Sequence, residues 1–191
     1  MTANTLRLIN RVSNRWGALN IRGPSVILSS LDWHGTKSSY FSKLSLDLIE
    51  SRQLSNIRIH ISRATSSLSE INLSGISPNK CMVPWNDIST LSLRRTIFQD
   101  FVNTVEKIPR LQNLTLESMR DDSELGIHLN GEKLYIPTLR AFSIYHQYSS
   151  IQRKHILRYF CLPNLETFSF DSSVQSESRL INFSRLVLYI A

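Results

Sequence analysis

A hexamer of the form L-x-x-L-x-L recurs nine times in this chain of 191 residues, and it constrains the fold more than any other feature of the sequence. Five of the eight intervals between successive copies lie between 20 and 28 residues, and the other three are 13, 14 and 18 residues. Recurrence at this period indicates a repeat architecture, in which each unit buries its apolar face against its neighbours. The copies begin at Trp16, Phe41, Leu54, Leu68, Ile88, Leu111, Leu139, Leu165 and Phe183.

The last residues of each hexamer alternate between apolar and polar, which is the period of a β-strand. In the copy ISTLSL, Leu91 and Leu93 point to one face of the strand and Ser92 points to the other. The same phase in the other copies places polar residues almost throughout on one face, while the alternate positions are Leu, Ile or Phe. We therefore predict short strands that each have one buried side and one side facing water.

Helices are predicted between some of these strands. Thr96 can cap a helix that ends before Pro109. A second helix, capped by Ser149 or Ser150, ends before Pro163. Strand, helix and strand in this order give parallel strands joined by right-handed crossovers. The apolar faces expected of the two helices are Phe98, Phe101, Val102, Val105 and Ile108, and Ile151, His155, Ile156, Tyr159 and Phe160.

These patterns predict an α/β leucine-rich-repeat solenoid, or horseshoe, with a curved parallel sheet and an irregular convex side of helices and loops. Residues 1–191 form a single irregular repeat domain in this interpretation, because no linker divides them. The last residues, 185–191, are an apolar strand-like run, so we expect a fragment without terminal caps. The alternative is an ordinary antiparallel sheet with one wet face.

Composition indicates an intracellular protein of the cytoplasm or nucleus. No apolar run approaches the roughly 20 residues of a membrane helix, and the N-terminal residues lack the apolar core and cleavage site of a signal peptide. The two cysteines, Cys81 and Cys161, suit reduced structural thiols better than a disulfide framework. We therefore expect no membrane partner.

The positive charge is concentrated in the first half of the chain. Residues 1–95 contain 12 Lys or Arg and 5 Asp or Glu, whereas residues 96–191 contain 10 of each. A basic half can attract nucleic acid or an acidic protein. No basic run exceeds two residues and aromatic residues do not alternate with basic ones along the strands. A nucleic-acid-binding solenoid is therefore the alternative function.

The sequence contains none of the short motifs that carry catalysis, cofactor binding or metal binding. The five histidines are scattered, and His155 lies six residues before Cys161, which is not a helical spacing for a nucleophile and its base. The acidic segment 120–124 lacks the ligand spacing of a calcium loop. We therefore predict a binding module that is not an enzyme and has no cofactor and no metal site.

Four segments resemble, in the same order, the repeat region of the F-box/leucine-rich-repeat proteins abundant in mushroom-forming fungi. The segment 13–21, SNRWGALNI, is similar to their S-x-R-W-x-x-L-x-I segment. The segment 83–93, VPWNDISTLSL, is similar to their L-P-W-x-Q-L-T-x-L-x-L segment. The segments 136–140, IPTLR, and 161–166, CLPNLE, are similar to their L-P-x-L-R/E repeat openings.

This resemblance implies the substrate-recognition part of an F-box-type ubiquitin-ligase receptor. Members of the family carry a helical F-box upstream, which docks onto the adaptor of a cullin-RING ligase. The residues before Trp16 are too few for that module, so the adaptor is an expected partner only if an F-box precedes the chain. The asparagine of the consensus repeat is also missing, since Pro24, Thr96, Met119 and Gln147 occupy its sites.

The candidate site is a row of long or charged side chains on the concave sheet, where the background is small Ser, Thr and Asn. Arg and Tyr are frequent anchors of protein interfaces. The basic members come early and the acidic members late, so we expect a protein partner with the reverse polarity along its length. Solvated side chains without a ligand are the alternative. The predicted partner-binding residues are Arg58, His60, Arg94, Glu117, Tyr145 and Asp171.

Overall fold

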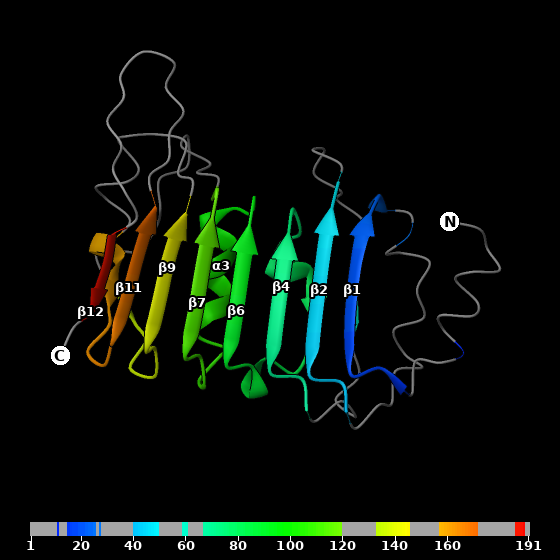
Figure 1. The fold of residues 1–191 in the computed structure, drawn as a ribbon, viewed down its shortest axis with the longest axis horizontal. Coiled ribbons are helices and arrows are strands. Elements are labelled where there is room, and N and C mark those ends of the chain that lie inside the picture. The colour runs from blue at the N-terminus through cyan, green and yellow to red at the C-terminus, as the bar shows by residue number, and fades with distance from the viewer. Residues whose placement is uncertain are drawn as a thin grey trace, which may run out of the picture.

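A computed structural model describes residues 11, 15–25, 27, 40–49, 59–60, 67–119, 133–145, 157–171 and 186–189. Its main feature is a sheet of eight strands, of which the first seven are parallel and stand side by side in sequence order (Figure 1). The parallel strands are β1 (Ala18–Gly23), β2 (Lys43–Leu48), β4 (Glu70–Ser74), β6 (Thr90–Arg94), β7 (Asn113–Glu117), β9 (Ala141–Tyr145) and β11 (Thr167–Asp171), and the eighth strand is β12 (Leu186–Tyr189).

The seven parallel strands pair without any offset between their hexamers. Leu91 of β6 pairs with Leu114 of β7, which pairs with Phe142 of β9, and Phe142 pairs with Phe168 of β11. Each hexamer position therefore forms one continuous row across the sheet. The predicted parallel sheet is confirmed for these seven strands, and the antiparallel alternative is excluded for them.

The inward hexamer positions form the core of the molecule. On the five strands β2, β4, β6, β7 and β9, every inward residue has at most 3% of its surface exposed. Leu19 and Ile21 of β1 and Phe168 and Phe170 of β11 are partly buried and pack against this core. The apolar residues that open the hexamers add a further buried row. Its members at 0% exposure are Phe41, Leu68, Ile88, Leu111 and Leu139.

Backbone hydrogen bonds repeat at the amino ends of the strands. The carbonyl of Ser69 accepts hydrogen bonds from the N–H groups of Ser89 (2.9 Å) and Thr90 (3.0 Å). The carbonyl of Ser89 accepts in the same way from Gln112 (2.8 Å) and Asn113 (3.0 Å). Successive repeats are therefore fixed to each other by their main chains before any side chain contributes.

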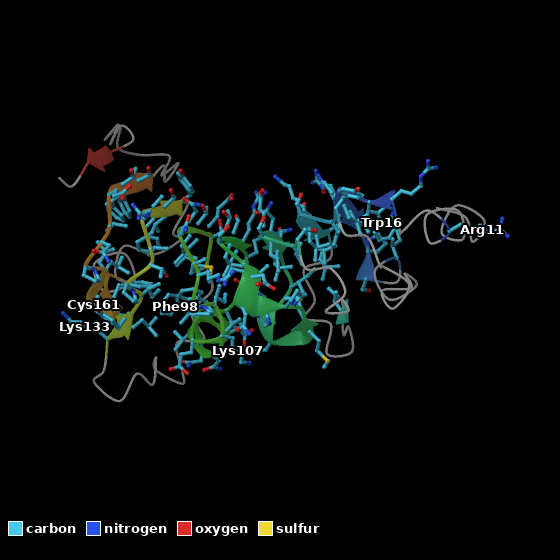
Figure 2. All side chains as sticks on the ribbon, turned by 90° about the horizontal axis from the view of Figure 1, so that it is seen from below. Arg11, Trp16, Phe98, Lys107, Lys133 and Cys161 are labelled. Atoms are coloured by element: carbon cyan, nitrogen blue, oxygen red, sulfur yellow. The ribbon has the colours of Figure 1, made fainter. Side chains whose placement is uncertain are left out.

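Short elements in the connections cover one face of the long sheet. Figure 2, viewed along the strands, places Phe98, Lys107, Lys133 and Cys161 together on that side. We call it the covered face and the other side the outward face. β3 pairs in parallel with β5, and β8 with β10, in two separate two-stranded sheets. The elements are β3 (Ile59–His60), η2 (Pro78–Lys80), β5 (Cys81–Met82), η3 (Trp85–Asp87), α3 (Phe98–Val105), β8 (Leu134–Tyr135), η4 (Leu157–Tyr159) and β10 (Phe160–Cys161).

The first predicted helix is confirmed as α3, but its predicted cap is wrong. All five residues of its predicted apolar face are buried. Ile97 stands at the cap position, and no side chain caps the helix. Thr96 is 3% exposed, and its hydroxyl lies 3.4 Å from the sulfur of Met119 in the next repeat. The hydroxyl of Thr96 therefore contacts Met119 in the core and makes no capping hydrogen bond to the helix.

The second predicted helix is wrong at its C-terminal end, and its first part lies outside the described residues. Tyr159 belongs to the 3-10 turn η4, and Phe160 belongs to the strand β10. The ring of Phe160 lies 5.0 Å from that of Phe142 and 6.1 Å from that of Phe101. Pairing with β8 and aromatic packing between repeats prevail over the helical period of the sequence.

Two of the nine hexamers do not extend the parallel sheet. Residues 54–58 of the hexamer at Leu54 lie outside the described residues, and its last residue, Ile59, forms β3 with His60 beside β5. The hexamer at Phe183 contributes to β12, which pairs with β11 in the antiparallel direction. Parallel pairing requires a crossover connection between two strands, and β12 runs in the direction opposite to β11.

We expect the hexamer phase to determine the stability of the protein. Replacing Leu91 or Leu114 by Ala should lower the free energy of unfolding by about 2–5 kcal/mol, because buried methyl groups are lost and a cavity remains. Replacing the outward Ser92 or Thr115 by Ala should change it by no more than about 0.5 kcal/mol. Urea unfolding followed by circular dichroism measures both sets, and equal losses in the two sets would show that the phase is wrong.

The buried thiol of Cys81 should make stability fall at high pH. Burial raises the pKa of this thiol from 9.0 to about 12. Between these values the unfolded chain has lost the proton and the folded chain still holds it, so rising pH favours unfolding. Cys81→Ala should therefore lose less stability than the wild type between about pH 9 and pH 11. Urea unfolding at several pH values tests this, and identical pH dependence of both proteins would contradict it.

Candidate functional site

The outward face of the sheet carries three rows of side chains, because the hexamers pair without offset. A middle row of small polar residues lies between a row at the amino ends of the strands and a row at their carboxyl ends. The middle row is Asn20, Ser45, Asn72, Ser92, Thr115, Ser143 and Ser169. The last row, called here the carboxyl-end row, is Arg22, Asp47, Ser74, Arg94, Glu117, Tyr145 and Asp171.

Four of the six predicted site residues are neighbours in the carboxyl-end row. Arg94 pairs with Glu117, Glu117 with Tyr145, and Tyr145 with Asp171, on the successive strands β6, β7, β9 and β11. His60 does not join them, since it belongs to β3 in a separate sheet, and its predicted place beside them is wrong. Arg58 lies outside the described residues.

Within this row, Arg94 and Glu117 form an ion pair. The Nε atom of Arg94 lies 3.0 Å from Oε1 of Glu117, and the two side chains are 51% and 25% exposed. Pairs this exposed stabilise a protein by about 0–1 kcal/mol. The main effect of the Arg94–Glu117 pair is to hold two long side chains in a fixed arrangement beside the half-buried Tyr145.

A second charged cluster lies at the other end of the row, around Asp47 and Arg95. The Nη2 atom of Arg95 lies 2.7 Å from Oδ1 of Asp47, and it donates to the carbonyl of Leu48 and the hydroxyl of Ser74, both at 2.8 Å. Arg22 contacts the other carboxylate oxygen of Asp47, at 3.3 Å. Arg95 follows β6, so its side chain reaches across β4 to β2 and fastens three strands together.

Sequence reasoning missed Arg95 because it follows the strand, where alternation no longer indicates direction. Arg95 has a φ of 53°, in the left-handed region, and Ser118 after β7 has a φ of 50°. The aligned residue after β4 is Gly75, with a φ of 71°. Glycine adopts this conformation readily, whereas other residues are strained by about 1 kcal/mol or more. Aligning the repeats on Gly75 is the signal that could have found the turn.

These three turns carry a hydrogen-bond ladder along the carboxyl ends of the strands. Gly75 N–H donates to the carbonyl of Arg94 at 2.8 Å, and Arg95 N–H donates to that of Glu117 at 3.0 Å. Ser118 N–H donates to the carbonyl of Tyr145, also at 3.0 Å. The main chain of the carboxyl-end row is therefore fixed from β4 to β9, which positions the predicted anchors before any partner arrives.

Lys43 and Glu70 form a fourth ion pair, at the amino ends of β2 and β4. The Nζ atom of Lys43 lies 2.7 Å from Oε1 of Glu70, and Asn72 donates to the same oxygen at 3.1 Å. The hydrogen bond from Lys43 lowers the pKa of the Glu70 carboxyl, and partial burial opposes this effect. Glu70 therefore stays ionised at neutral pH.

The cations of the outward face are compensated by carboxylates of the same face. Arg22, Lys43, Arg94 and Arg95 all contact Asp47, Glu70 or Glu117. Four of the 12 Lys and Arg residues of the first half of the sequence are thus paired with carboxylates on the sheet. Over β9 and β11, the outward positions before Asp171 are uncharged. They are Ala141, Ser143, Tyr145, Thr167 and Ser169.

The described residues include no group of three or more His, Cys, Asp or Glu side chains placed to hold a metal ion. Within the same part of the chain, no helix has the length and apolar character needed to cross a membrane. Comparison of the chain with protein-family models, with curated proteins and with solved structures finds no match.

We expect Arg95 to stabilise the sheet more than its neighbour Arg94 does. Arg95→Ala removes three contacts and should lower the free energy of unfolding by about 1–3 kcal/mol. The ion pair with Asp47 contributes little of this loss, because the Arg95 side chain is 33% exposed. Arg95→Gly should be less damaging by about 1 kcal/mol, because glycine relieves the positive φ. Arg94→Ala is the control, with a loss of no more than about 1 kcal/mol. Urea unfolding measures all three, and equal losses for Arg94→Ala and Arg95→Ala would contradict this role.

Proposed function

We propose that this chain is a non-enzymatic, intracellular interaction module that binds another protein on its outward face. The observation that carries the proposal is the alignment of Arg94, Glu117, Tyr145 and Asp171 on four successive strands. Interfaces depend on a few Arg, Tyr or Trp anchors surrounded by residues that exclude water. Tyr145 lies half-buried between Glu117 and Asp171 in the carboxyl-end row, and an aromatic ring that carries a polar hydroxyl suits such an anchor.

We also propose that the repeats form a leucine-rich-repeat solenoid. Seven in-register parallel strands in sequence order support this, as do the short elements that lie on one face between successive strands. Repeating backbone hydrogen bonds at both ends of the strands give further support, because contacts between nearest neighbours stabilise a solenoid. In a curved solenoid the outward face is the concave surface.

The resemblance to fungal F-box/leucine-rich-repeat proteins suggests the kind of protein that is bound. We propose a substrate of a cullin-RING ubiquitin ligase, recognised by this module as the receptor part of the ligase. The segments 13–21, 83–93, 136–140 and 161–166 support this step. The ligase adaptor itself would be a partner only through an F-box upstream of these repeats.

Nucleic-acid binding has less support. Binding to phosphates requires cations that are free to replace counterions. On the described strands, four cations of the outward face already contact carboxylates. Salt dependence separates the two functions, because phosphate contacts weaken steeply as salt rises and an anchor such as Tyr145 does not.

We expect the double variant Arg94→Ala/Tyr145→Ala to lose its partner. Truncation of two anchors should weaken binding by at least about 2 kcal/mol, or roughly thirtyfold. The tagged chain and its variants are used for affinity capture from cells that naturally express it, and bound proteins are quantified by mass spectrometry.

The matched control is Lys107→Ala/Tyr135→Ala, which removes one exposed cation and one exposed tyrosine from the covered side. It should retain the captured proteins. The hypothesis is wrong if both double variants remain folded, by circular dichroism, and capture the same proteins as the wild type.

A further inference from the structure

An open groove of about 720 Å³ lies on the covered face, between α3 and the segment 133–138 that contains β8. Its apolar floor comes from both sides. The floor residues Val102, Val105, Ile108, Leu134 and Ile136 are each between 2% and 8% exposed. Ligand sites in proteins have volumes of roughly 300–1,000 Å³, so the groove is large enough to hold a short segment of chain.

The groove exists because one repeat carries a helix where its neighbours carry strands. β3 pairs with β5 and β8 pairs with β10, but α3 stands between these two short sheets in the order of the repeats. A helix uses its own backbone groups internally and offers none to a neighbouring strand. The edge of β8 that faces α3 therefore has no strand beside it among the described residues.

Within the described residues, the edge of β8 away from β10 has no partner, and it presents the backbone of Tyr135. Ile136 N–H donates to the carbonyl of Cys161 in β10 at 3.1 Å. In a parallel ladder, alternate residues direct their backbone groups to opposite sides, so the N–H and C=O of Tyr135 point away from β10 and toward the groove. An unpaired strand edge of this kind is a template for a further strand.

The rims of the groove are polar and oppositely charged. Gln99, Asn103 and Glu106 line it from α3, and Lys133 lines it from the strand side. Glu106 and Lys133 are both exposed, and no ion pair joins them in the described part of the chain. Side-chain amides on one wall and backbone groups on the other can both hydrogen-bond an extended main chain.

We propose that this groove binds an extended peptide segment of another protein by strand addition to β8. The N–H and C=O of Tyr135 pair with the peptide backbone, and alternate apolar side chains of the peptide pack onto the floor. An acidic peptide residue lies against Lys133 and a basic one against Glu106, so the two ends of the segment are distinguished by charge. This site is separate from the outward face and does not depend on its function.

The proposal is tested with two fluorescent peptides that share alternating Val and Thr and differ in charge order. Their sequences are Glu-Val-Thr-Val-Thr-Val-Lys and its reverse, which cover both strand directions. We expect saturable binding of at least one peptide by fluorescence anisotropy. Methylation of the backbone nitrogens of its valines should weaken binding at least about tenfold, because the edge hydrogen bonds are lost.

Two pairs of variants locate the site. Asn103→Trp fills the groove and should weaken peptide binding at least about tenfold. Lys107 is exposed just after α3 and does not line the groove, so Lys107→Trp should leave peptide binding unchanged. Tyr135→Pro removes the N–H that faces the groove and should weaken binding, whereas Tyr135→Ala retains it. Thermal melting by circular dichroism confirms that each variant is folded. Arg94→Ala/Tyr145→Ala should bind the peptide like the wild type, which separates this site from the outward face.

Three outcomes would overturn the proposal. The first is that neither peptide shows saturable binding to the wild type. The second is that the Asn103→Trp and Lys107→Trp variants are both folded and bind the peptide equally. The third is strong protection of the Tyr135 amide from hydrogen exchange in the free protein, which would show that the chain itself already pairs with this edge.

Discussion

The zero-offset pairing of seven parallel strands is the constraint on which the other features of the molecule depend. A slip of one residue between two strands would turn a row of Leu and Ile to water and a row of Ser and Asn to the core. The buried rows therefore select the register, since each inward residue of the five strands from β2 to β9 is almost completely enclosed. Once the register is fixed, it also determines which outward residues lie next to each other on neighbouring strands.

The surface charges follow from this register. Arg94 lies beside Glu117 and Lys43 beside Glu70 only because their strands align. Arg95 adds a contact that spans two strands, and it is held in a left-handed turn by the backbone ladder at the carboxyl ends. The result is a face whose cations are paired with carboxylates over the first strands, and on which Tyr145 lies between Glu117 and Asp171. The pairing of these cations supports the proposed contact with a protein over contact with phosphates.

The covered face has no fixed register between successive repeats, and its elements are therefore irregular. Its elements have only to enclose the inward rows, and a strand or a helix can each do so. Phe98 and Phe101 of α3 reach the ring of Phe160 in β10, so aromatic packing joins the helix to a later repeat without backbone pairing. Among the described residues, the edge of β8 that faces α3 is open as a consequence of this mixture, because a helix cannot continue the ladder of a strand.

The sequence by itself determined the hexamer phase, the buried rows, the helix at Phe98–Val105 and the neighbourhood of Arg94, Glu117 and Tyr145. These depend on local alternation and on a repeat that imposes the same pairing again and again. The cap at Thr96, the strand at Phe160, the separate sheet of His60, the direction of β12 and the reach of Arg95 were decided only by the tertiary structure. Each depends on a contact between residues distant in sequence. The local periodicity of the sequence carries no information about which distant group a side chain or strand edge will contact.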